Sequence, residues 1–262
     1  MKVYLIIPAY NEQARIINTL NFYEEVFRRN SIKHSIIVVS ESTDKTNSIV
    51  NDIKRKHHDV SLIYSKRRLG KGGAITKGFQ HAISKSSSND LIGFVDADNA
   101  IYASEFIRMV DYLKKSRETA GVIASRYSKG GKIIGYLPFS RHMSSRLYNL
   151  MVRMLFGIKY EDTQCGAKIF RSSALRKILP TLSVVDMSFD INLLYSAKIL
   201  GLKVKEIPIT YHQVNEGTKL VLRKQIPQMF IVTLGFRLSR SRLNRLFPSR
   251  LKEYIYNAVR KW

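Results

Sequence analysis

Two aspartates, Asp96 and Asp98, follow a short apolar run and are separated by a single alanine. In an extended chain the side chains at i and i+2 point to the same side, so both carboxylates can face one ligand. Carboxylate oxygens combined with substrate phosphates are what Mg²⁺ or Mn²⁺ binds in many enzymes. One aspartate could bind the ion directly while the other binds it through water or holds a ribose. A polar strand end or a helix cap is the alternative for an isolated pair, and placement in the fold decides between them.

A second candidate is the glycine-rich basic segment Ser65–Gly78, with Lys71 and Gly72 at its centre. Glycines let backbone amides approach a phosphate, and the N-terminus of a following helix favours an anion. The segment lacks the G-x-x-x-x-G-K-[ST] order of a P-loop. A loop with solvated lysines is the alternative.

The first apolar run of the chain ends in Pro8-Ala9-Tyr10-Asn11-Glu12. Tyr10 could stack on a nucleotide base, and Glu12 could accept a hydrogen bond from base or ribose. Asn11 or Glu12 could equally begin a helix. Asp44 has the same two interpretations, as a helix cap or as a nucleotide contact.

A further carboxylate, Asp162, lies in the segment Asp162–Gly166, where it would be near the reaction centre. The segment also holds Cys165, the single cysteine of the chain, which excludes an internal disulfide and a cysteine-rich zinc site. No Cys–His pairing is visible, so a thiol nucleophile is not expected.

The elements that must position these residues alternate between short Ile- and Val-rich runs and stretches with helical spacing. The runs predict buried strands at Val3–Pro8, Ser35–Val39, Val60–Tyr64 and Leu91–Val95. Helices are predicted around Ile16–Phe27, at Asp44–His57 and at Gly73–Ser84. This order predicts an α/β fold, a Rossmann-like mostly parallel sheet flanked by helices. Ligands of such sheets bind beyond the carboxyl ends of the strands, where the candidate residues follow.

The second half is less regular. A strand is expected at Val122–Ser125, a helix at Phe189–Leu200 capped by Gly201, and a strand at Val204–Tyr211 broken by Pro208. Between them, seven apolar side chains fall on one face of a predicted helix: Phe139, Met143, Leu147, Leu150, Met151, Met154 and Leu155. One domain, residues 1–220, with a basic amphipathic extension, residues 221–262, is the simplest organisation.

Charge is the unusual property of the composition. The chain has 262 residues, with 44 Lys and Arg against 20 Asp and Glu, giving a net charge of +24. Such a field attracts nucleic acid, anionic lipids or phosphorylated substrates. The excess lies beside amphipathic apolar stretches, at Phe139–Phe156 and Ile226–Trp262, which favours an anionic membrane surface over nucleic acid. No signal peptide or membrane-spanning run is expected, so we predict peripheral attachment to the cytoplasmic face of a membrane.

Five segments, in the same order, are similar to motifs of one enzyme family. They are IPAYNE (Ile7–Glu12), VDADNA (Val95–Ala100), SRYSKGGK (Ser125–Lys132), DTQCGAKIF (Asp162–Phe170) and EGTKL (Glu216–Leu220). Together they resemble the family 2 glycosyltransferases of the GT-A fold, and among these the dolichyl-phosphate glucose and mannose synthases. The resemblance covers about residues 3 to 220.

The resemblance implies a role for each matched residue. Pro8, Tyr10 and Glu12 would bind the nucleotide, and Asp96 and Asp98 would hold the metal. In the later motifs, phosphate-facing and catalytic roles would fall to Arg126, Lys219 and Asp162.

Three positions depart from the family pattern. Where the family carries paired aspartates, this chain has Glu41, which could take over the base contact. Ala100 stands where the mannose enzymes have a glutamine, and the glucose enzymes have an aromatic residue near His212. The first two of these differences affect metal geometry and base identity.

The resemblance further implies an inverting transfer of a hexose from a nucleotide diphosphate sugar to a polyprenyl or dolichyl phosphate. UDP-glucose is the favoured donor and GDP-mannose the next. Arg141 and Arg146, which edge the apolar helix face, are the candidate acceptor contacts, because arginine binds phosphate through paired donors. A saccharide or glycolipid acceptor is the alternative. A sugar-nucleotide pyrophosphorylase would instead need a glycine-rich loop directly after the first strand.

Overall fold

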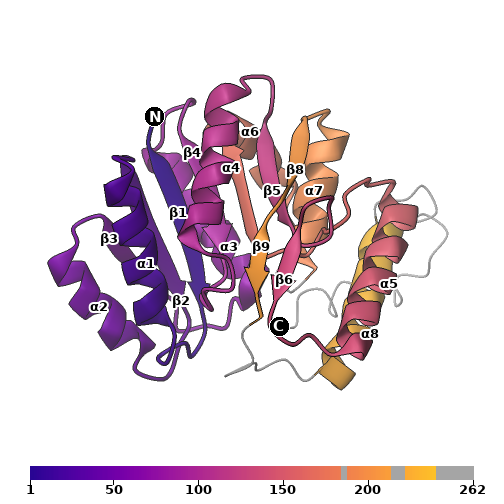
Figure 1. Cartoon of the computed structure of the whole chain (residues 1–262), viewed down its shortest axis with the longest axis horizontal. Helices are drawn as coiled ribbons and strands as arrows, with labels where there is room; N and C mark the ends of the chain where they lie inside the picture. The colour runs from indigo at the N-terminus through magenta and orange to yellow at the C-terminus, as the bar shows by residue number, and fades with distance from the viewer. Residues whose placement is uncertain (184–187, 214–221, 240–262) are drawn as a thin grey trace.

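The computed structural model describes residues 1–183, 188–213 and 222–239, which form one seven-stranded sheet with helices on both faces (Figure 1). The strand order is β3-β2-β1-β4-β7-β5-β8. The strands are β1 (Val3–Ala9), β2 (His34–Ser40), β3 (Val60–Tyr64), β4 (Leu91–Val95), β5 (Gly121–Ser125), β7 (Ala167–Arg171) and β8 (Val204–Pro208). Only β7 runs antiparallel to its neighbours, β4 and β5. The predicted α/β fold with a mostly parallel sheet is therefore confirmed.

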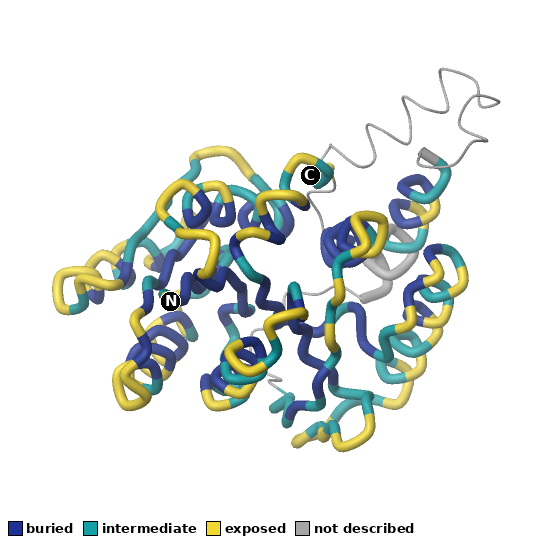
Figure 2. Tube along the Cα trace, turned by 90° about the horizontal axis from the view of Figure 1, so that it is seen from above, coloured by how far each residue is buried: buried dark blue, intermediate teal, exposed yellow. Residues whose placement is uncertain are grey.

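Two hydrophobic cores form, one on each face of the sheet. The first lies under α1 (Ile16–Arg29), α2 (Thr46–Lys56) and α4 (Ala103–Lys115). The second lies under α3 (Gly70–Lys85), α6 (Ser172–Ile178) and α7 (Phe189–Ile199). A 3-10 turn, Leu179–Thr181, follows α6. Figure 2 shows that the buried residues follow the strands and the inner sides of these helices.

Two long helices, α5 (Phe139–Phe156) and α8 (Leu222–Ser239), lie side by side at one end of the sheet (Figure 1). They are joined by the buried hydroxyls of Tyr148 and Thr233, 2.8 Å apart, and by the stacked rings of Phe156 and Phe236. None of the helices in the described ranges combines the length and the apolar character needed to cross a bilayer.

Most predicted elements are present, with shifted ends. The helix expected at Gly73–Ser84 begins three residues earlier, at Gly70, so the glycine cluster lies inside its first turns rather than in a loop before it. Close packing explains the glycine at Gly72, since a Cβ there would come within 2.5 Å of the Cβ of Phe189. Gly201, at φ +65°, ends α7 as expected.

The strand expected at Val204–Tyr211 is broken after Pro208, as predicted. Its second part, β9 (Thr210–His212), leaves the main sheet and pairs in parallel with β6 (Lys132–Ile134). The elements β6, β7, α4 and α6 and the 3-10 turn were not predicted from the sequence pattern.

Candidate active site

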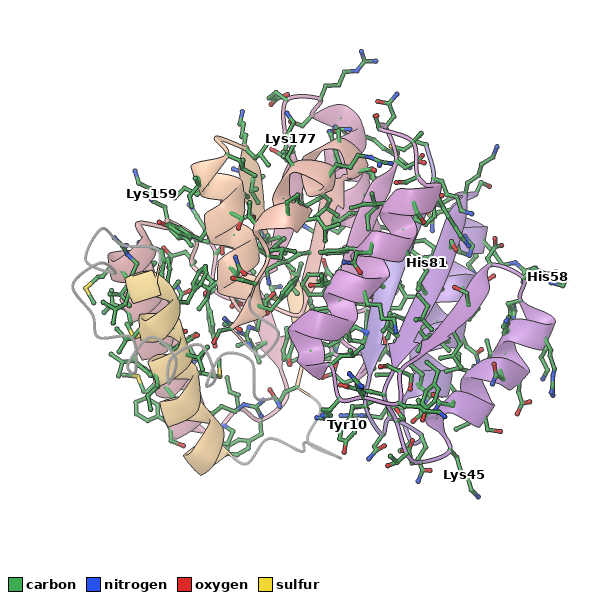
Figure 3. The ribbon with its side chains drawn as sticks, turned by 180° about the vertical axis from the view of Figure 1, so that it is seen from behind. Tyr10, Lys45, His58, His81, Lys159 and Lys177 are labelled. Carbon is green, nitrogen blue, oxygen red and sulfur yellow. The ribbon has the colours of Figure 1, made fainter. Side chains whose placement is uncertain are left out.

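The candidate residues gather at the edge where the parallel strands end. Tyr10, after β1, and Lys45, after β2, lie at this edge in Figure 3. The loops after β1 and β2 are tied together, because the Asn11 amide donates to the hydroxyl of Ser42 and the Asn11 side chain accepts from the Thr43 amide, each at 2.8 Å. Asp44 lies in the loop after β2, and its carboxylate accepts a hydrogen bond from the first backbone amide of α2, at Thr46. This contact is the one expected of a helix cap.

The reversed strand β7 brings the Asp162–Gly166 segment to the same edge. The backbone amide of Asp96 donates to the carbonyl of Gly166 at 3.2 Å. A Cβ at Gly166 would collide with the Asp96 carboxylate, so the close approach requires glycine. The turn after β4 and the loop before β7 are therefore in direct contact and line the same side of the candidate site.

The Asp96–Asp98 pair lies against a partly buried lysine. The ammonium of Lys71 is 2.7 Å from Oδ1 of Asp96. Burial alone would lower the pKa of Lys71, but Asp96 first, and then Asp190 and Asp98, outweigh burial and raise it. Burial and then the neighbouring charge of Asp96 raise the pKa of Asp98. Two carboxylates that disfavour each other's charge form a site that gains free energy from a cation.

The donor atoms of this turn fit a hard divalent cation. Both carboxylates supply oxygen, and Asp98 also accepts from the amide of Ala100 at 3.0 Å, which fixes its orientation. The same turn holds Oδ1 of Asn99, a buried oxygen for which the described part of the chain offers no hydrogen-bond donor. Oxygen-rich sets of this kind suit Mg²⁺ or Mn²⁺.

The residues that were expected to contact the nucleotide interact with other groups of the protein. An arginine that was not singled out, Arg68, places its guanidinium carbon 3.2 Å from the centre of the Tyr10 ring, where a base would stack. Glu12 accepts from Nε of Arg15 at 2.8 Å. Glu41 is buried and accepts from the backbone amides of Leu69 and Gly70. The carboxylate of Glu41 thereby holds the start of α3.

Asp162 is buried and bound by an arginine. Nε and Nη2 of Arg126 donate to its two oxygens at 2.7 and 2.9 Å, and the Arg126 amide donates at 3.0 Å. On the other side, the carboxylate of Glu206 accepts from the amides of Glu161 and Asp162 at 2.9 and 2.8 Å. Asp162 and Arg126, expected to act separately, are thus one unit, and this arrangement suits positioning better than proton abstraction.

The thiol in this loop is chemically inert. Burial first, and then the charge of Asp162, raise the pKa of Cys165 to about 12. A thiol with such a pKa is almost entirely protonated near neutral pH, which agrees with the expectation that Cys165 is not a nucleophile.

Helix α5 turns most of its apolar face outward. Five side chains are between 49% and 76% exposed: Phe139, Met143, Leu147, Leu150 and Met154. We call these five the α5 stripe. Met151 and Leu155, which were predicted to share that face, instead pack against the core. The opposite face is buried through Tyr148, Val152 and Phe156, so the helix is anchored without the stripe.

The two candidate acceptor arginines differ in position. Arg146 donates to the carbonyl of Glu161 at 3.1 Å and to its carboxylate at 3.2 Å, directly beside Asp162. Its guanidinium also lies 4.9 Å from the centre of the Tyr127 ring. Arg153 binds the same carboxylate at 2.8 Å. Arg141 lies in the first turn of α5, further from this cluster along the helix.

The remaining site residues are placed as follows. Pro8 lies at the end of β1, and Gly72 in the first turn of α3. Lys219 lies outside the described residues. Sequence reasoning missed Glu206 and the buried pair Lys168–Asp190, whose charged atoms are 2.6 Å apart. Arg68 was included in the basic glycine-rich segment, but its contact with Tyr10 was not predicted.

Comparisons with known proteins agree with this geometry. The sequence profile of glycosyl transferase family 2 matches residues 4–179. The chain is 29% identical to the dolichyl-phosphate beta-glucosyltransferase of Dictyostelium discoideum, over 82% of this chain and 68% of that protein. It is 26% identical to the undecaprenyl-phosphate mannosyltransferase of Micrococcus luteus, over 80% and 84%.

A similar fold is known from a solved structure. Glucosyl-3-phosphoglycerate synthase of Mycobacterium tuberculosis, in complex with Mn²⁺, UDP and phosphoglyceric acid, matches with a TM-score of 0.64 at 16% identity. The match covers 90% of this chain and 78% of that one. The chain is therefore similar to known proteins in its fold as well as in its sequence.

Proposed function

The chain belongs to glycosyl transferase family 2, and we propose that it transfers a hexose from a nucleotide diphosphate sugar to a polyprenyl or dolichyl phosphate at a membrane surface. UDP-glucose is the preferred donor in this proposal, with GDP-mannose second. The names of the Dictyostelium and Micrococcus relatives support a lipid-phosphate acceptor and leave both hexoses open.

The observation that carries the acceptor assignment is the position of the α5 stripe. The stripe is exposed, and on the same helix Arg146 reaches the backbone of Glu161, next to Asp162. An apolar surface that adjoins a guanidinium and the site edge suits a ligand with a hydrocarbon chain and a phosphate headgroup. A small soluble acceptor would use neither the stripe nor its arginines.

The donor would bind along the edge formed by β1, β2 and β4. Tyr10 would stack on the base once Arg68 moves aside, and Glu12 and Glu41 would border the base and ribose. Asp96 and Asp98 would hold Mg²⁺ or Mn²⁺, which would neutralise charge on the leaving diphosphate. Solved neighbours of the same fold are described with Mn²⁺ or Mg²⁺ and UDP, which supports this placement.

Around the diphosphate, this chain supplies further positive charge. Lys71 lies beside Asp96, and the first-turn amides of α3, including that of Gly72, favour an anion. We assign Lys219 to the same phosphates. Charge that develops on a leaving group is stabilised best by donors already in place.

In the proposed reaction an oxygen of the lipid phosphate attacks the anomeric carbon from the face opposite the diphosphate. The new carbon–oxygen bond forms as the bond to the nucleoside diphosphate breaks, so the anomeric configuration inverts. The acceptor oxygen is already anionic, so no strong base has to remove a proton. Asp162, held by Arg126, would orient the acceptor side of the site.

We further propose a catalytic unit of residues 1–220 and a basic extension of residues 221–262 that binds anionic lipid together with the α5 stripe. The protein would attach peripherally to the cytoplasmic face of a membrane. Each Lys or Arg near an anionic surface contributes about 1 kcal/mol, and salt screens this attraction.

Transfer of label tests the function directly. The full chain is incubated with radiolabelled UDP-glucose or GDP-mannose, Mn²⁺ and vesicles that contain polyprenyl phosphate, and lipid is then extracted. We expect label in the lipid fraction, more from UDP-glucose, and none without polyprenyl phosphate. Transfer to free sugars at the same rate in vesicles without lipid phosphate would refute the acceptor assignment.

A further inference from the structure

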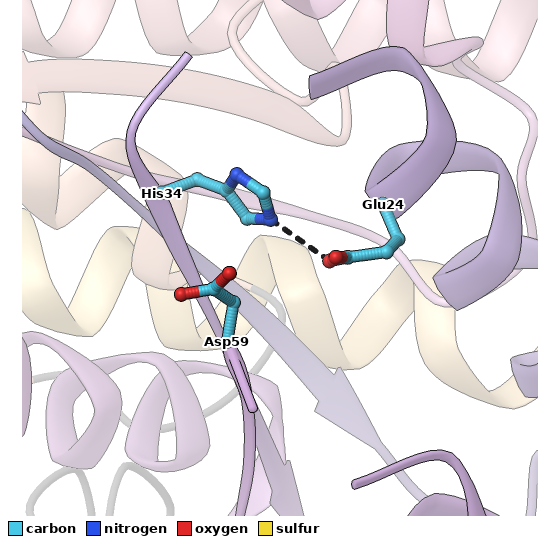
Figure 4. Close-up of side chains that lie close together, drawn as sticks. All are labelled: Glu24, His34 and Asp59. Atoms are coloured by element: carbon cyan, nitrogen blue, oxygen red, sulfur yellow. Dashed lines mark hydrogen bonds and ion pairs between the residues drawn. The ribbon is translucent and has the colours of Figure 1, made fainter. Parts of the chain in front are cut away.

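A second cluster of ligand-type side chains lies at the opposite edge of the sheet, where β2 and β3 begin. Glu24 comes from α1, His34 from the first residue of β2, and Asp59 from the residue before β3 (Figure 4). One ligand atom of each lies within 4.8 Å of the others. Because the active site lies at the carboxyl ends of these strands, this cluster is separate from it.

The ring of His34 is oriented as in a metal ligand. Its Nδ1 lies 2.8 Å from the carbonyl oxygen of Ile32, which can only accept, so Nδ1 carries a proton. Nε2 is the nitrogen that faces the cluster, and it lies 2.8 Å from Oε2 of Glu24. At this distance the two atoms share a proton in a hydrogen bond, so a bound metal ion would have to replace that proton. Metal-binding histidines commonly donate their second ring nitrogen to a backbone carbonyl in this way.

A fourth side chain approaches the same carboxylate. Nδ1 of His57 lies 3.6 Å from Oε1 of Glu24, so the two oxygens of Glu24 face two different imidazoles. The three ligand atoms that lie within 4.8 Å of one another come from one imidazole and two carboxylates, and His57 adjoins this cluster through Glu24. Mixed imidazole and carboxylate sets in a compact arrangement are typical of Zn²⁺ sites.

We propose that Glu24, His34 and Asp59 form a Zn²⁺ site, adjoined by His57, that links α1, the start of β2 and the loop between α2 and β3. Burial supports a site of defined geometry, since Glu24 and His34 are buried and the ring of Phe27 stacks on His34 at 4.9 Å. Asp59 is exposed and shares a surface hollow with His34, which gives an ion access from solvent, and Lys2, Arg28 and Lys33 line the same hollow. The donor set contains nitrogen, whereas the Asp96–Asp98 turn offers oxygen, so the two sites would select different metals.

The test uses the full chain with Asp96→Asn and Asp98→Asn, which removes the proposed catalytic metal site from the measurement. Zn²⁺ is titrated by calorimetry, and bound zinc is counted after gel filtration. We expect one equivalent of zinc and a zinc-dependent rise in Tm. His57→Gln, which removes a neighbour of the ligand Glu24, should weaken binding at least about tenfold, and Asp59→Asn, which removes a ligand, should weaken it more.

The matched control is His58→Gln, because His58 neighbours His57 in sequence and is exposed. It should bind zinc like the parent. Both test residues are at least partly exposed, so their substitution should leave the fold intact, and thermal unfolding without zinc verifies this. Absence of stoichiometric binding would show that His34 and Glu24 form an ion pair only and would overturn the proposal. Unchanged affinity in Asp59→Asn would overturn it as well.

Discussion

Nζ of Lys71 lies 2.7 Å from Oδ1 of Asp96, so an ammonium that is only 15% exposed contacts the carboxylate that the sequence predicts as a metal ligand. In the proposed function, the charge of this lysine would compete with a metal ion for Asp96. With the diphosphate bound, the same ammonium would bind phosphate instead.

Lys71→Met should therefore change metal affinity and turnover in opposite directions. Mn²⁺ affinity should rise, because a competing positive charge is removed, while kcat/KM for the donor falls about tenfold to hundredfold. That range corresponds to the roughly 1.5–3 kcal/mol of a hydrogen bond to a charged group. Mn²⁺ titration and steady-state kinetics measure both quantities. Lys85→Met, in the last turn of the same helix, is the control, and weaker Mn²⁺ binding in Lys71→Met would contradict this interpretation.

Asp98→Asn should stabilise the metal-free protein while it lowers activity strongly. The pKa of Asp98 is raised in the folded chain, so its ionisation costs folding free energy as pH rises above the unfolded value of about 3.9. Asparagine removes that cost, and we expect Tm in EDTA at pH 7 to rise by about 2–4 °C, the effect of roughly 1 kcal/mol in a domain of this size. The gain should disappear in acid, where Asp98 is protonated. A lower Tm at pH 7 would show that the charged form is not destabilising.

The Arg126–Asp162 pair should be worth more to stability than a surface ion pair. Arg126→Met leaves the buried Asp162 carboxylate without its charged partner, which costs about 3–5 kcal/mol in comparable cases. Arg126→Lys should recover only part, because lysine cannot donate two parallel hydrogen bonds. Urea unfolding of both variants and of Arg126→Met combined with Asp162→Asn forms a double-mutant cycle. Additive losses would mean that the two side chains are not coupled.

The α5 stripe should determine binding to membranes. A variant with Leu147→Gln, Leu150→Gln and Met154→Gln loses side chains that would each contribute up to about 1.5–3 kcal/mol when fully buried in lipid. We expect vesicle binding in flotation assays to fall at least about tenfold, with Tm unchanged. Ile199→Gln is the matched control, because Ile199 is 59% exposed but ends α7 instead. Equal flotation of the triple variant and the parent would exclude the stripe as a lipid contact.

The acceptor headgroup should depend on Arg146 more than on Arg153. Both bind the carboxylate of Glu161, but only Arg146 is hydrogen-bonded to the Glu161 backbone beside Asp162. Arg146→Ala should raise KM for polyprenyl phosphate with donor binding nearly unchanged, and Arg141→Ala should act in the same direction. Arg153→Ala serves as control for loss of charge near Glu161. A change confined to KM for the donor would show that these arginines contact the donor and not the acceptor.

The part of the fold that local pattern specifies was predictable. Apolar runs gave β1 to β5 within one or two residues, because parallel strands buried on both faces contain almost no polar side chains. The reversed strand β7 was not predictable in this way. Its lysine, Lys168, is fully buried and is paired with Asp190 on α7. A lysine in a short segment usually indicates exposure to solvent, and the local sequence does not reveal a partner so far along the chain.

The candidate site could likewise be predicted only where local sequence pattern determines it. Asp96 and Asp98 could be proposed as candidates from their place after a strand, whereas the partners of Asp162 depend on tertiary contacts. Glu206, in β8, sits in an alternating strand pattern where a carboxylate is usually exposed to solvent. Its hydrogen bonds to the amides of Glu161 and Asp162 arise only when β8 pairs with β5.

The order of strands in the sheet also bears on how the chain folds as it is made. The first four strands form an unbroken parallel block, β3-β2-β1-β4, from residues that are synthesised before the other strands of this sheet. β4 and β5 are not neighbours, so the centre of the sheet stays open until β7 is synthesised and inserts between them. The edge formed by β1, β2 and β4 can therefore assemble during translation, whereas the loop that holds Asp162 must wait for contacts of high sequence separation, which form slowly.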